Sequence, residues 1–255
     1  MSIISSFPET FPETFPETNG INIKNEKSLH QDIKKWYYQN GDRLEVKVSG
    51  KIIDIVRDDL LIEIQTQNLS AIKMKIAKLI DQHRIRAVYP LAIESTVITL
   101  APKSYEILRS RKSPKKLTFI DIFDELLGIA SYLAHKNFSL DVILIKQQDV
   151  RIDDGHGSWR RRGVSIVDKH LLEVVDRKFF ATAEDYLQIL PIKKLPTLFT
   201  NKELAQIMNL KCNKVTKITY CLKKMNLITV IGRRKRSLLY SLPDPTLDPT
   251  LPSLI

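Results

Sequence analysis

Cysteine is scarce in this chain, and long apolar runs are missing. Only Cys212 and Cys221 occur among 255 residues, with no His/Cys cluster around them, which excludes a disulfide scaffold and a thiolate zinc finger. No stretch approaches 18 consecutive apolar residues, so we expect no membrane span and no membrane partner. The first residues show neither the basic nor the apolar segment of a signal peptide. A reducing, cytoplasmic location is the expectation.

Positive charge is abundant but unevenly placed. The net charge is +11, from 40 Lys and Arg against 29 Asp and Glu, which favours a polyanionic partner, nucleic acid first. Residues 193–242 hold 12 basic residues and one acidic residue, so the remaining 205 residues hold 28 of each sign. The expected nucleic-acid contact is therefore located near the C-terminus.

Composition breaks divide the chain into five segments. Residues 1–24 contain three Phe-Pro-Glu-Thr repeats and residues 243–255 repeat Asp-Pro-Thr-Leu; both predict disordered tails, because frequent proline prevents helices and sheet ladders. Residues 25–117 predict a helix, three strands, a helix and two strands. Residues 118–192 predict an α+β segment, and residues 193–242 predict two helices and a hairpin. The expected fold class is α/β (α+β) with a mixed sheet.

The most informative pattern covers residues 42–65, where apolar and polar residues alternate as in half-buried strands. Ser49-Gly50 and Asp58-Asp59 are expected to be two-residue hairpin turns. Paired residue numbers would then sum to 99 in the first hairpin and to 117 in the second. One face would carry only aliphatic side chains: Leu44, Val46, Val48, Ile53, Ile55, Leu60, Ile62 and Ile64.

Three carboxylates line up on the opposite face of these strands. Glu45 is placed opposite Asp54, and Asp54 opposite Glu63. Directly opposed like charges, with Cβ atoms about 4.5–5.5 Å apart, destabilise a sheet, so the row favours a hard cation with oxygen ligands. The alternative is a solvated polar face whose acids are relieved by Lys47 and Lys51.

The order of helix, meander, helix and strand, with Asp54 nine residues before Glu63-Ile64-Gln65, resembles the restriction-endonuclease-like nuclease superfamily. That superfamily carries Asp on its second core strand, Glu-x-Lys on its third, and often another acid on the preceding helix. The resemblance covers about residues 25–100. It implies that Asp54 and Glu63 are catalytic acids, and Gln65 stands where the superfamily has lysine.

This resemblance implies Mg²⁺- or Mn²⁺-dependent hydrolysis of phosphodiester bonds in DNA. Asp54 and Glu63 would bind the metal, with the Ile64 carbonyl and Glu45 as further ligands. Gln65 could orient the attacking water but could not deprotonate it. A metal-bound hydroxide or a phosphate oxygen would have to act as the base.

Two further candidates lie at the first predicted helix. Glu26 is the matching helical acid, and His30 follows one turn into the helix. A partly buried histidine without a catalytic role is the alternative for His30. The second helix, at about residues 69–80, is expected to bury its isoleucines and Leu79 and to show Lys73, Lys75 and Lys78 elsewhere, either at a DNA-facing edge or on a solvated face.

Residues 153–163 form a glycine-bracketed loop that contains Arg160, Arg161 and Arg162 beside a tryptophan. Arginine suits phosphate because its planar fork of donors pairs two oxygens at once, so DNA contact is one expectation. A plain hairpin loop is the equal alternative. The acids and the histidine at the start of the loop also suggest a second metal site.

Residues 193–242 resemble the winged helix-turn-helix family in the order, length and charge of their elements. The resemblance implies that the second helix enters the major groove of DNA and that the basic hairpin contacts phosphates or the minor groove. A winged helix used for protein contacts is the alternative. The implied DNA contacts are Lys211, Asn213, Lys214, Thr216 and Lys217 on the helix, and Arg233, Arg234, Lys235 and Arg236 on the hairpin.

Taken together, these patterns favour a metal-dependent DNA endonuclease whose winged helix holds the substrate. The alternative is a DNA-binding or regulatory protein whose nuclease fold has lost catalysis, which Gln65 favours. DNA is the expected partner, and a homodimer or a protein partner is left open. The layout of residues 25–242 is also similar to that of uncharacterised prokaryotic proteins.

Overall fold

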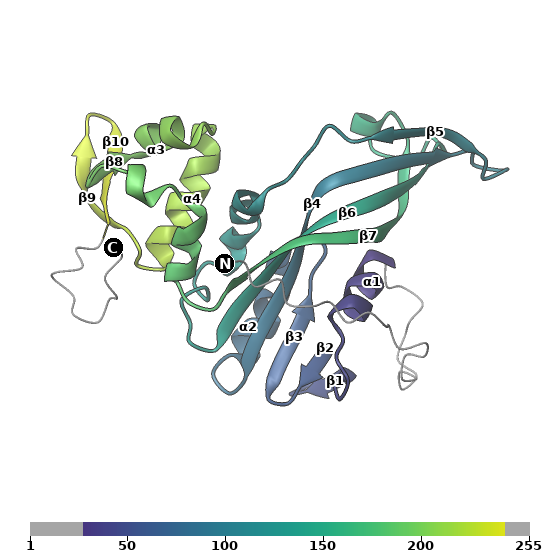
Figure 1. Ribbon diagram of the computed structural model, residues 1–255, viewed down its shortest axis with the longest axis horizontal. Helices are drawn as coiled ribbons and strands as arrows, with labels where there is room; N and C mark the ends of the chain where they lie inside the picture. The colour runs from purple at the N-terminus through teal and green to yellow at the C-terminus, as the bar shows by residue number, and fades with distance from the viewer. Residues whose placement is uncertain (1–27, 243–255) are drawn as a thin grey trace.

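The computed structural model describes residues 28–242 of the chain. Both predicted tails and the candidate acid Glu26 lie outside the described residues. The described part is a mixed α/β protein (Figure 1). It contains a seven-stranded mixed sheet with short helices on both faces, and a three-stranded sheet with two helices.

The N-terminal elements follow the order predicted from the sequence. The first helix, α1 (Ser28–Tyr37), buries Leu29, Ile33 and Tyr37. These residues recur every four positions, so they form the apolar stripe of an amphipathic helix. The next elements are β1 (Arg43–Val48), β2 (Lys51–Arg57), β3 (Leu60–Ile64), the 3₁₀ turn η2 (Leu69–Ile72) and α2 (Lys73–Leu79).

Both predicted hairpin registers are confirmed. Ile55 pairs with Leu44 across the first turn and with Ile62 across the second, so the paired numbers sum to 99 and 117. Ser49 and Gly50 have φ values of 46° and 77°, the left-handed conformation that a type I′ turn requires at both central positions.

The prediction of a single aliphatic face is wrong. Ile55 and Ile62 pack with α1, whereas Ile53 packs on the other face with α2. Glu45 has a φ of 53°, which interrupts the alternation of β1, and Val46 consequently joins Ile53 on the α2 face. The meander is therefore covered on both faces, and β3 is buried along its whole length.

The large sheet has the strand order β1-β2-β3-β4-β6-β7, in which β3, β4 and β6 run parallel and β5 pairs with the outer half of β4. The outer halves of β4, β6 and β7 project with β5 as an arm, residues 94–112 and 146–171 (Figure 1). The predicted boundary at residue 117 thus falls between strands of one sheet. The bounds are β4 (Arg84–Leu100), β5 (Ile107–Lys112), β6 (Phe138–Ile152) and β7 (Ser165–Phe180).

A buried polar network ties α1 to this sheet. Asp141 on β6 has 0% exposure and accepts hydrogen bonds from the Tyr37 hydroxyl at 2.6 Å and from Arg177 Nε at 2.8 Å. Arg86 donates to the Tyr37 hydroxyl at 3.3 Å. A buried carboxylate is tolerated only when it is paired and hydrogen-bonded. These four residues, the Asp141 network, therefore fix α1 against β4, β6 and β7.

The C-terminal module begins with a helix cap. The Thr200 side chain accepts from the Glu203 backbone N–H, and the Glu203 carboxylate accepts from the Thr200 N–H, a reciprocal capping box. Two helices then pack on a three-stranded sheet of order β8-β10-β9. The elements are β8 (Leu198–Thr200), α3 (Asn201–Met208), α4 (Cys212–Lys224), β9 (Thr229–Arg234) and β10 (Ser237–Ser241).

One apolar core joins this module to the large sheet. Ile218 and Cys221 of α4 belong to the same buried cluster as Phe123 and Tyr186, which lie on the 3₁₀ turns η3 (Phe119–Asp124) and η6 (Glu184–Ile189). Burial raises the pKa of the Cys221 thiol to about 12, as expected for a core residue.

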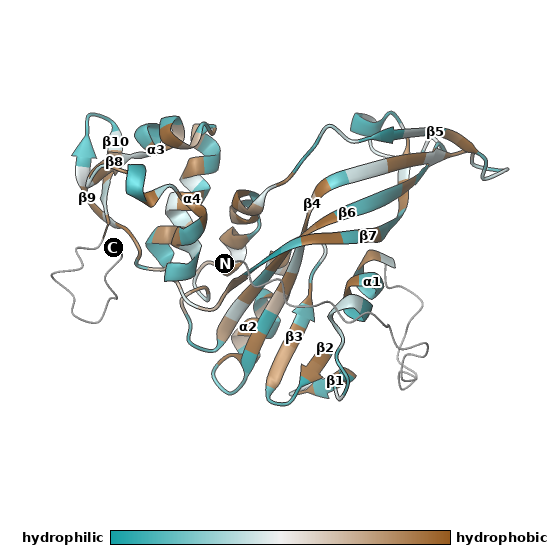
Figure 2. Ribbon diagram, in the orientation of Figure 1, coloured by the Kyte–Doolittle hydropathy of each residue, from teal (hydrophilic) through white to brown (hydrophobic). Residues whose placement is uncertain are grey.

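Apolar residues run along β3 in Figure 2. No helix within residues 28–242 is long and apolar enough to cross a membrane.

Candidate functional site

Asp54 lies in the middle of β2 and is surrounded by nitrogen atoms. Its Oδ2 accepts the Ile64 backbone N–H at 2.7 Å and lies 3.3 Å from His30 Nε2. Its Oδ1 lies 3.9 Å from Lys34 Nζ. His30 and Lys34 are four residues apart on α1, so they share one helix face. The helix therefore places two basic side chains over this carboxylate.

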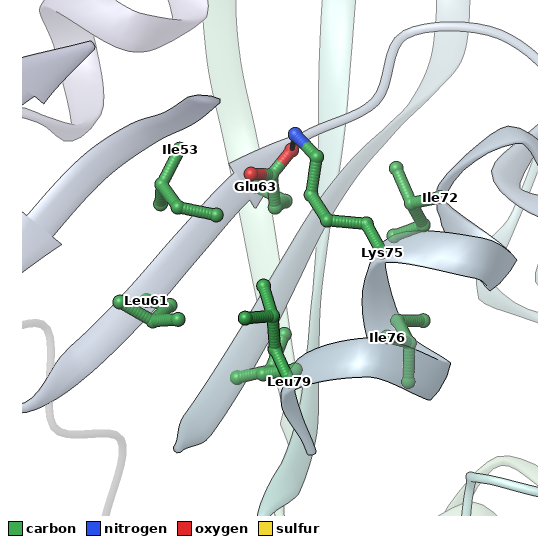
Figure 3. Close-up of a pocket in the computed structure, with 8 residues that line it drawn as sticks. Ile53, Leu61, Glu63, Ile72, Lys75, Ile76 and Leu79 are labelled. Carbon is green, nitrogen blue, oxygen red and sulfur yellow. Dashed lines mark hydrogen bonds and ion pairs between the residues drawn. The ribbon is translucent and has the colours of Figure 1, made fainter. Parts of the chain in front are cut away.

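Glu63 follows on β3 and is only 4% exposed. Lys75 of α2 reaches it with Nζ 2.6 Å from Oε2 (Figure 3), and the same ammonium donates to the Ile52 carbonyl at 2.6 Å. The other oxygen, Oε1, is buried and accepts no hydrogen bond from any group in residues 28–242. Leaving a buried acceptor unsatisfied is unfavourable, so a cation at Oε1 would be stabilising.

The protonation of Glu63 reflects this environment. Burial raises the pKa of Glu63 to about 7, and the charge of Asp54 acts in the same direction, whereas Lys75 and His30 oppose the shift. Asp54 is contacted from α1 and Glu63 from α2, which cover opposite faces of the meander, and the charge of Asp54 still contributes to the raised pKa of Glu63.

We expect Glu63 to make the folded protein less stable as the pH rises. Its pKa is about 7 in the folded state against a reference of 4.5, so its stabilising contribution is complete below the reference value and is lost as the pH rises through 7. Compared with Glu63→Gln, the wild type should lose about 3 kcal/mol of unfolding free energy between about pH 4.5 and about pH 8. Urea denaturation of both proteins measures this, and parallel pH dependences would contradict it.

Other predicted site residues have different partners. Glu45 forms an ion pair with Lys34, so it is not part of an unrelieved row of acids. Gln65 directs its amide nitrogen to the carbonyls of Gln67 and Asn68 in the loop after β3. The predicted row of three acids on one face is therefore wrong: Asp54 lies beside His30 of α1, whereas Glu63 lies beside Lys75 of α2.

The prediction that Lys75 faces away from the sheet is wrong. Lys75 shares one face of α2 with Ile72, Ile76 and Leu79, and all four line the same interface with β3 (Figure 3). The sequence does contain a signal for this contact, because Lys75 falls within the apolar stripe of the helix. Lysine is almost never buried without a partner, so its position in the stripe indicates a buried ion pair. Here that partner is Glu63.

The described residues offer few ligands for a metal ion at this site. Within residues 28–242 no group of three or more His, Cys, Asp and Glu side chains is placed to hold a metal, so Asp54 and Glu63 would act as two ligands. Mg²⁺ is commonly bound by one or two carboxylates and keeps several waters. The unsatisfied Oε1 of Glu63 fits such an ion, and Lys75 occupies only Oε2.

The lysines of α4 are only partly available to an outside partner. Lys214 Nζ lies 3.0 Å from Asp121 and 2.6 Å from Asp124, and Lys217 Nζ lies 2.9 Å from Asp124. The Lys214 side chain is 12% exposed. Both acids belong to η3, so Lys214 and Lys217 bind the body of the protein. This corrects the expectation that these two lysines face DNA.

The remaining predicted contacts of the module are exposed, apart from one ion pair. Arg234 is held by Glu203, with Nη1 2.6 Å from the carboxylate. Because Arg234 lies on the β9–β10 hairpin and Glu203 on α3, this ion pair fixes the hairpin against the helix. The exposed residues are Lys211, Asn213 and Thr216 on α4, and Arg233, Lys235 and Arg236 on the hairpin.

The loop at residues 153–163 is held partly by its own atoms. Arg161 Nε donates to the Val164 carbonyl just after the loop, whereas Arg160 and Arg162 are exposed. Asp154 accepts hydrogen bonds from a backbone N–H and a serine hydroxyl nearby, which lower its pKa. Two arginines are therefore free to meet an anion, and Asp154 already has donors.

The segment around β5, residues 103–116, carries positive charge that is not evident in the overall balance of residues outside 193–242. Residues 103–116 contain six basic residues and one acid. Every residue of the edge strand β5 is exposed, including Arg109, Arg111 and Lys112. Basic residues on an exposed strand were a detectable signal, but a charge sum over 205 residues averages it away.

The fold and the Asp54–Glu63 pair lie within a known domain family. Residues 27–181 match the family described as Domain of unknown function (DUF8091), and the chain belongs to that family. The matched region ends just after β7, so it includes α1, the large sheet and the arm. It does not include the C-terminal module.

An uncharacterized protein of Treponema pallidum (strain Nichols) is 31% identical over 227 residues, which cover 88% of this chain and 88% of that protein. This match is longer than the whole of residues 1–181, so the similarity reaches into the C-terminal module. No solved structure matches this chain.

Proposed function

We propose that the protein is a metal-dependent DNA endonuclease whose C-terminal module is a winged helix-turn-helix that holds DNA. The observation that carries the proposal is the pair Asp54 and Glu63 on adjacent strands, with a buried Glu63 oxygen that no described protein group satisfies. The order α1, antiparallel meander, α2 and parallel β4 supports a restriction-endonuclease-like core.

In this proposal Asp54 and Glu63 hold Mg²⁺ or Mn²⁺, which when bound supplies charge stabilisation at the scissile phosphate and an activated water. His30, 3.3 Å from Asp54, orients that carboxylate. Lys75 binds Glu63 Oε2 and leaves Oε1 to the metal. The Lys75 ammonium would also supply, from α2, the positive charge that the superfamily's lysine supplies at the position of Gln65. A fixed charge near a reacting phosphate favours the transition state.

Two exposed basic surfaces would contact the phosphates of DNA. Arg109 and Arg111 are two residues apart on β5, so they project from the same face of the strand. The β9–β10 hairpin presents Arg233, Lys235 and Arg236. Arginine-to-phosphate contacts supply most of the sequence-independent affinity for DNA and make it sensitive to salt.

Charge reversal on either surface should weaken DNA binding. For Arg109→Glu with Arg111→Glu, we expect at least about 10-fold weaker binding to a short duplex and a salt dependence about two units shallower. Arg233→Glu with Arg236→Glu should act in the same way. Fluorescence anisotropy at several salt concentrations measures both quantities.

Lys214→Gln with Lys217→Gln is the matched control. These lysines are held by Asp121 and Asp124, so their loss should change the affinity for DNA little. Unchanged binding in both charge-reversal variants would rule out these surfaces as the DNA contacts.

A second candidate function is DNA binding without cleavage. The ion pair between Lys75 and Glu63 favours it, because an ammonium can supply the positive charge that a carboxylate pair otherwise obtains from a metal. Protein that retains DNA but leaves supercoiled plasmid intact with both Mg²⁺ and Mn²⁺ would have this second function.

A further inference from the structure

A cavity of about 390 Å³ lies beside the candidate site but contains neither Asp54 nor Glu63. Thr66 and Asn68, which follow β3, form one side, and residues of β4, β6 and η3 form the others. Ligand sites in α/β sheets lie typically outside the carboxyl ends of parallel strands. The volume falls within the usual range for small-molecule sites, about 300–1,000 Å³.

One wall of this cavity is a buried polar row on β6. Asp149 is 7% exposed and accepts from Gln147 Nε2 at 2.7 Å and from Arg151 Nη2 at 3.2 Å. Arg151 Nε is buried and has no hydrogen-bond partner among residues 28–242. A buried donor without an acceptor is costly. An acceptor supplied by a ligand would satisfy it.

The charges around the cavity favour an anion. Asp149 is neutralised by Arg151, and the two acids of η3 are neutralised by the lysines of α4. Glu125 is engaged by the Tyr89 hydroxyl, a contact that together with burial raises the pKa of that tyrosine. Lys115 and Lys169 also line the cavity, and no described acid is paired with either of them in an ion pair.

The remaining lining residues suit an uncharged and partly polar portion of a ligand. Leu29, Pro90 and Leu91 are apolar, and Tyr89 also lines the cavity. Side-chain amides complete the surface, and these can donate and accept at once. An inorganic anion alone would leave the apolar part unfilled, because ligand sites of this size bury most of a ligand's surface.

We infer that this cavity binds a nucleoside monophosphate. The phosphate would pair with Lys115, Lys169 and the guanidinium of Arg151, and the nucleoside would lie against Tyr89 and Leu91. The same group exists as a free mononucleotide and as the 5′-phosphorylated end of a DNA strand. The inference does not require the nuclease activity, because the cavity does not include the carboxylate pair.

Isothermal titration calorimetry of the full chain with EDTA present tests the inference. The probes are AMP, dTMP, inorganic phosphate, and a short single-stranded oligonucleotide with a 5′-phosphate or a 5′-hydroxyl. We expect the mononucleotides to bind at least about 10-fold more tightly than phosphate. A preference for the 5′-phosphorylated oligonucleotide over both mononucleotides would identify a DNA end as the source, and the reverse order a free nucleotide.

Variants of the wall identify the site. Arg151→Lys keeps the charge beside Asp149 but removes the planar guanidinium, and Lys169→Gln removes one charge from the lining; each should weaken mononucleotide binding at least about 10-fold. Lys146→Gln on the same strand, which pairs with Glu173, should bind like wild type, and so should Asp54→Asn. Failure of any nucleotide probe to bind, equal affinity for phosphate, or wild-type affinity in both wall variants would overturn the inference.

Discussion

Replacing Asp54 by Asn, or Glu63 by Gln, is expected to lower Mg²⁺-dependent cleavage of supercoiled plasmid by at least about 100-fold. A catalytic metal contributes several kcal/mol, and about 2.7 kcal/mol already corresponds to that factor. The amides keep the size of each side chain but lose the charge that holds the ion. Initial nicking rates of wild type and variants, with Mg²⁺ and with Mn²⁺, provide the measurement.

Glu173→Gln is the matched control for this experiment, because Glu173 is an exposed carboxylate on β7 that pairs with Lys146. It should retain wild-type activity. Equal cleavage rates in the wild type and all variants would mean that cleavage comes from another site or from a contaminant. Either explanation would exclude catalysis by Asp54 and Glu63. Absence of cleavage in the wild type with retained DNA binding would leave the second candidate function.

Asp141→Ala should lower the free energy of unfolding by about 3–5 kcal/mol, the usual effect of removing one partner of a buried ion pair. Asp141 has 0% exposure in the wild type and accepts hydrogen bonds from Tyr37 and Arg177. The variant leaves both donors facing the space that the carboxylate occupied. Urea denaturation followed by circular dichroism measures the change.

A milder and a neutral variant make this result interpretable even if Asp141→Ala does not fold. Tyr37→Phe removes a single hydrogen bond to Asp141 and should be destabilising by about 1–2 kcal/mol. Asp176→Asn, at an exposed acid beside Arg177, should change stability by less than about 0.5 kcal/mol. Equal stability of Tyr37→Phe and Asp176→Asn would contradict a structural role for the network.

Local chemistry was sufficient to predict much of the secondary structure. Turn residues such as Ser49 and Gly50 set the hairpin registers, because a two-residue turn permits only one pairing. The spacing of Leu29, Ile33 and Tyr37 is typical of an amphipathic helix such as α1, and Thr200 is a residue type that favours the start of a helix such as α3. Each of these signals is contained within about ten consecutive residues, as secondary-structure patterns are.

The contacts that define the site depend on long-range packing and were harder to predict from the sequence. A strict alternation rule could not show that Glu45 interrupts β1, so it assigned Ile53 to the wrong face. Lys75 was read as a surface lysine although α2 turns it onto β3. The ion pair of Lys214 with Asp121 joins residues 93 positions apart, and no local pattern predicts which exposed charges a distant segment will neutralise.

The edge position of β5 has a consequence for how this protein behaves in concentrated solution. An exposed edge strand offers unpaired backbone groups to any neighbouring chain, and many proteins avoid such pairing by placing charge along the edge. Two copies that met along β5 would bring Arg109, Arg111 and Lys112 of each strand together, and like charges facing one another are repulsive. The charges along β5 would therefore oppose the pairing of this edge with that of a second copy, and they would attract a polyanion at the same place.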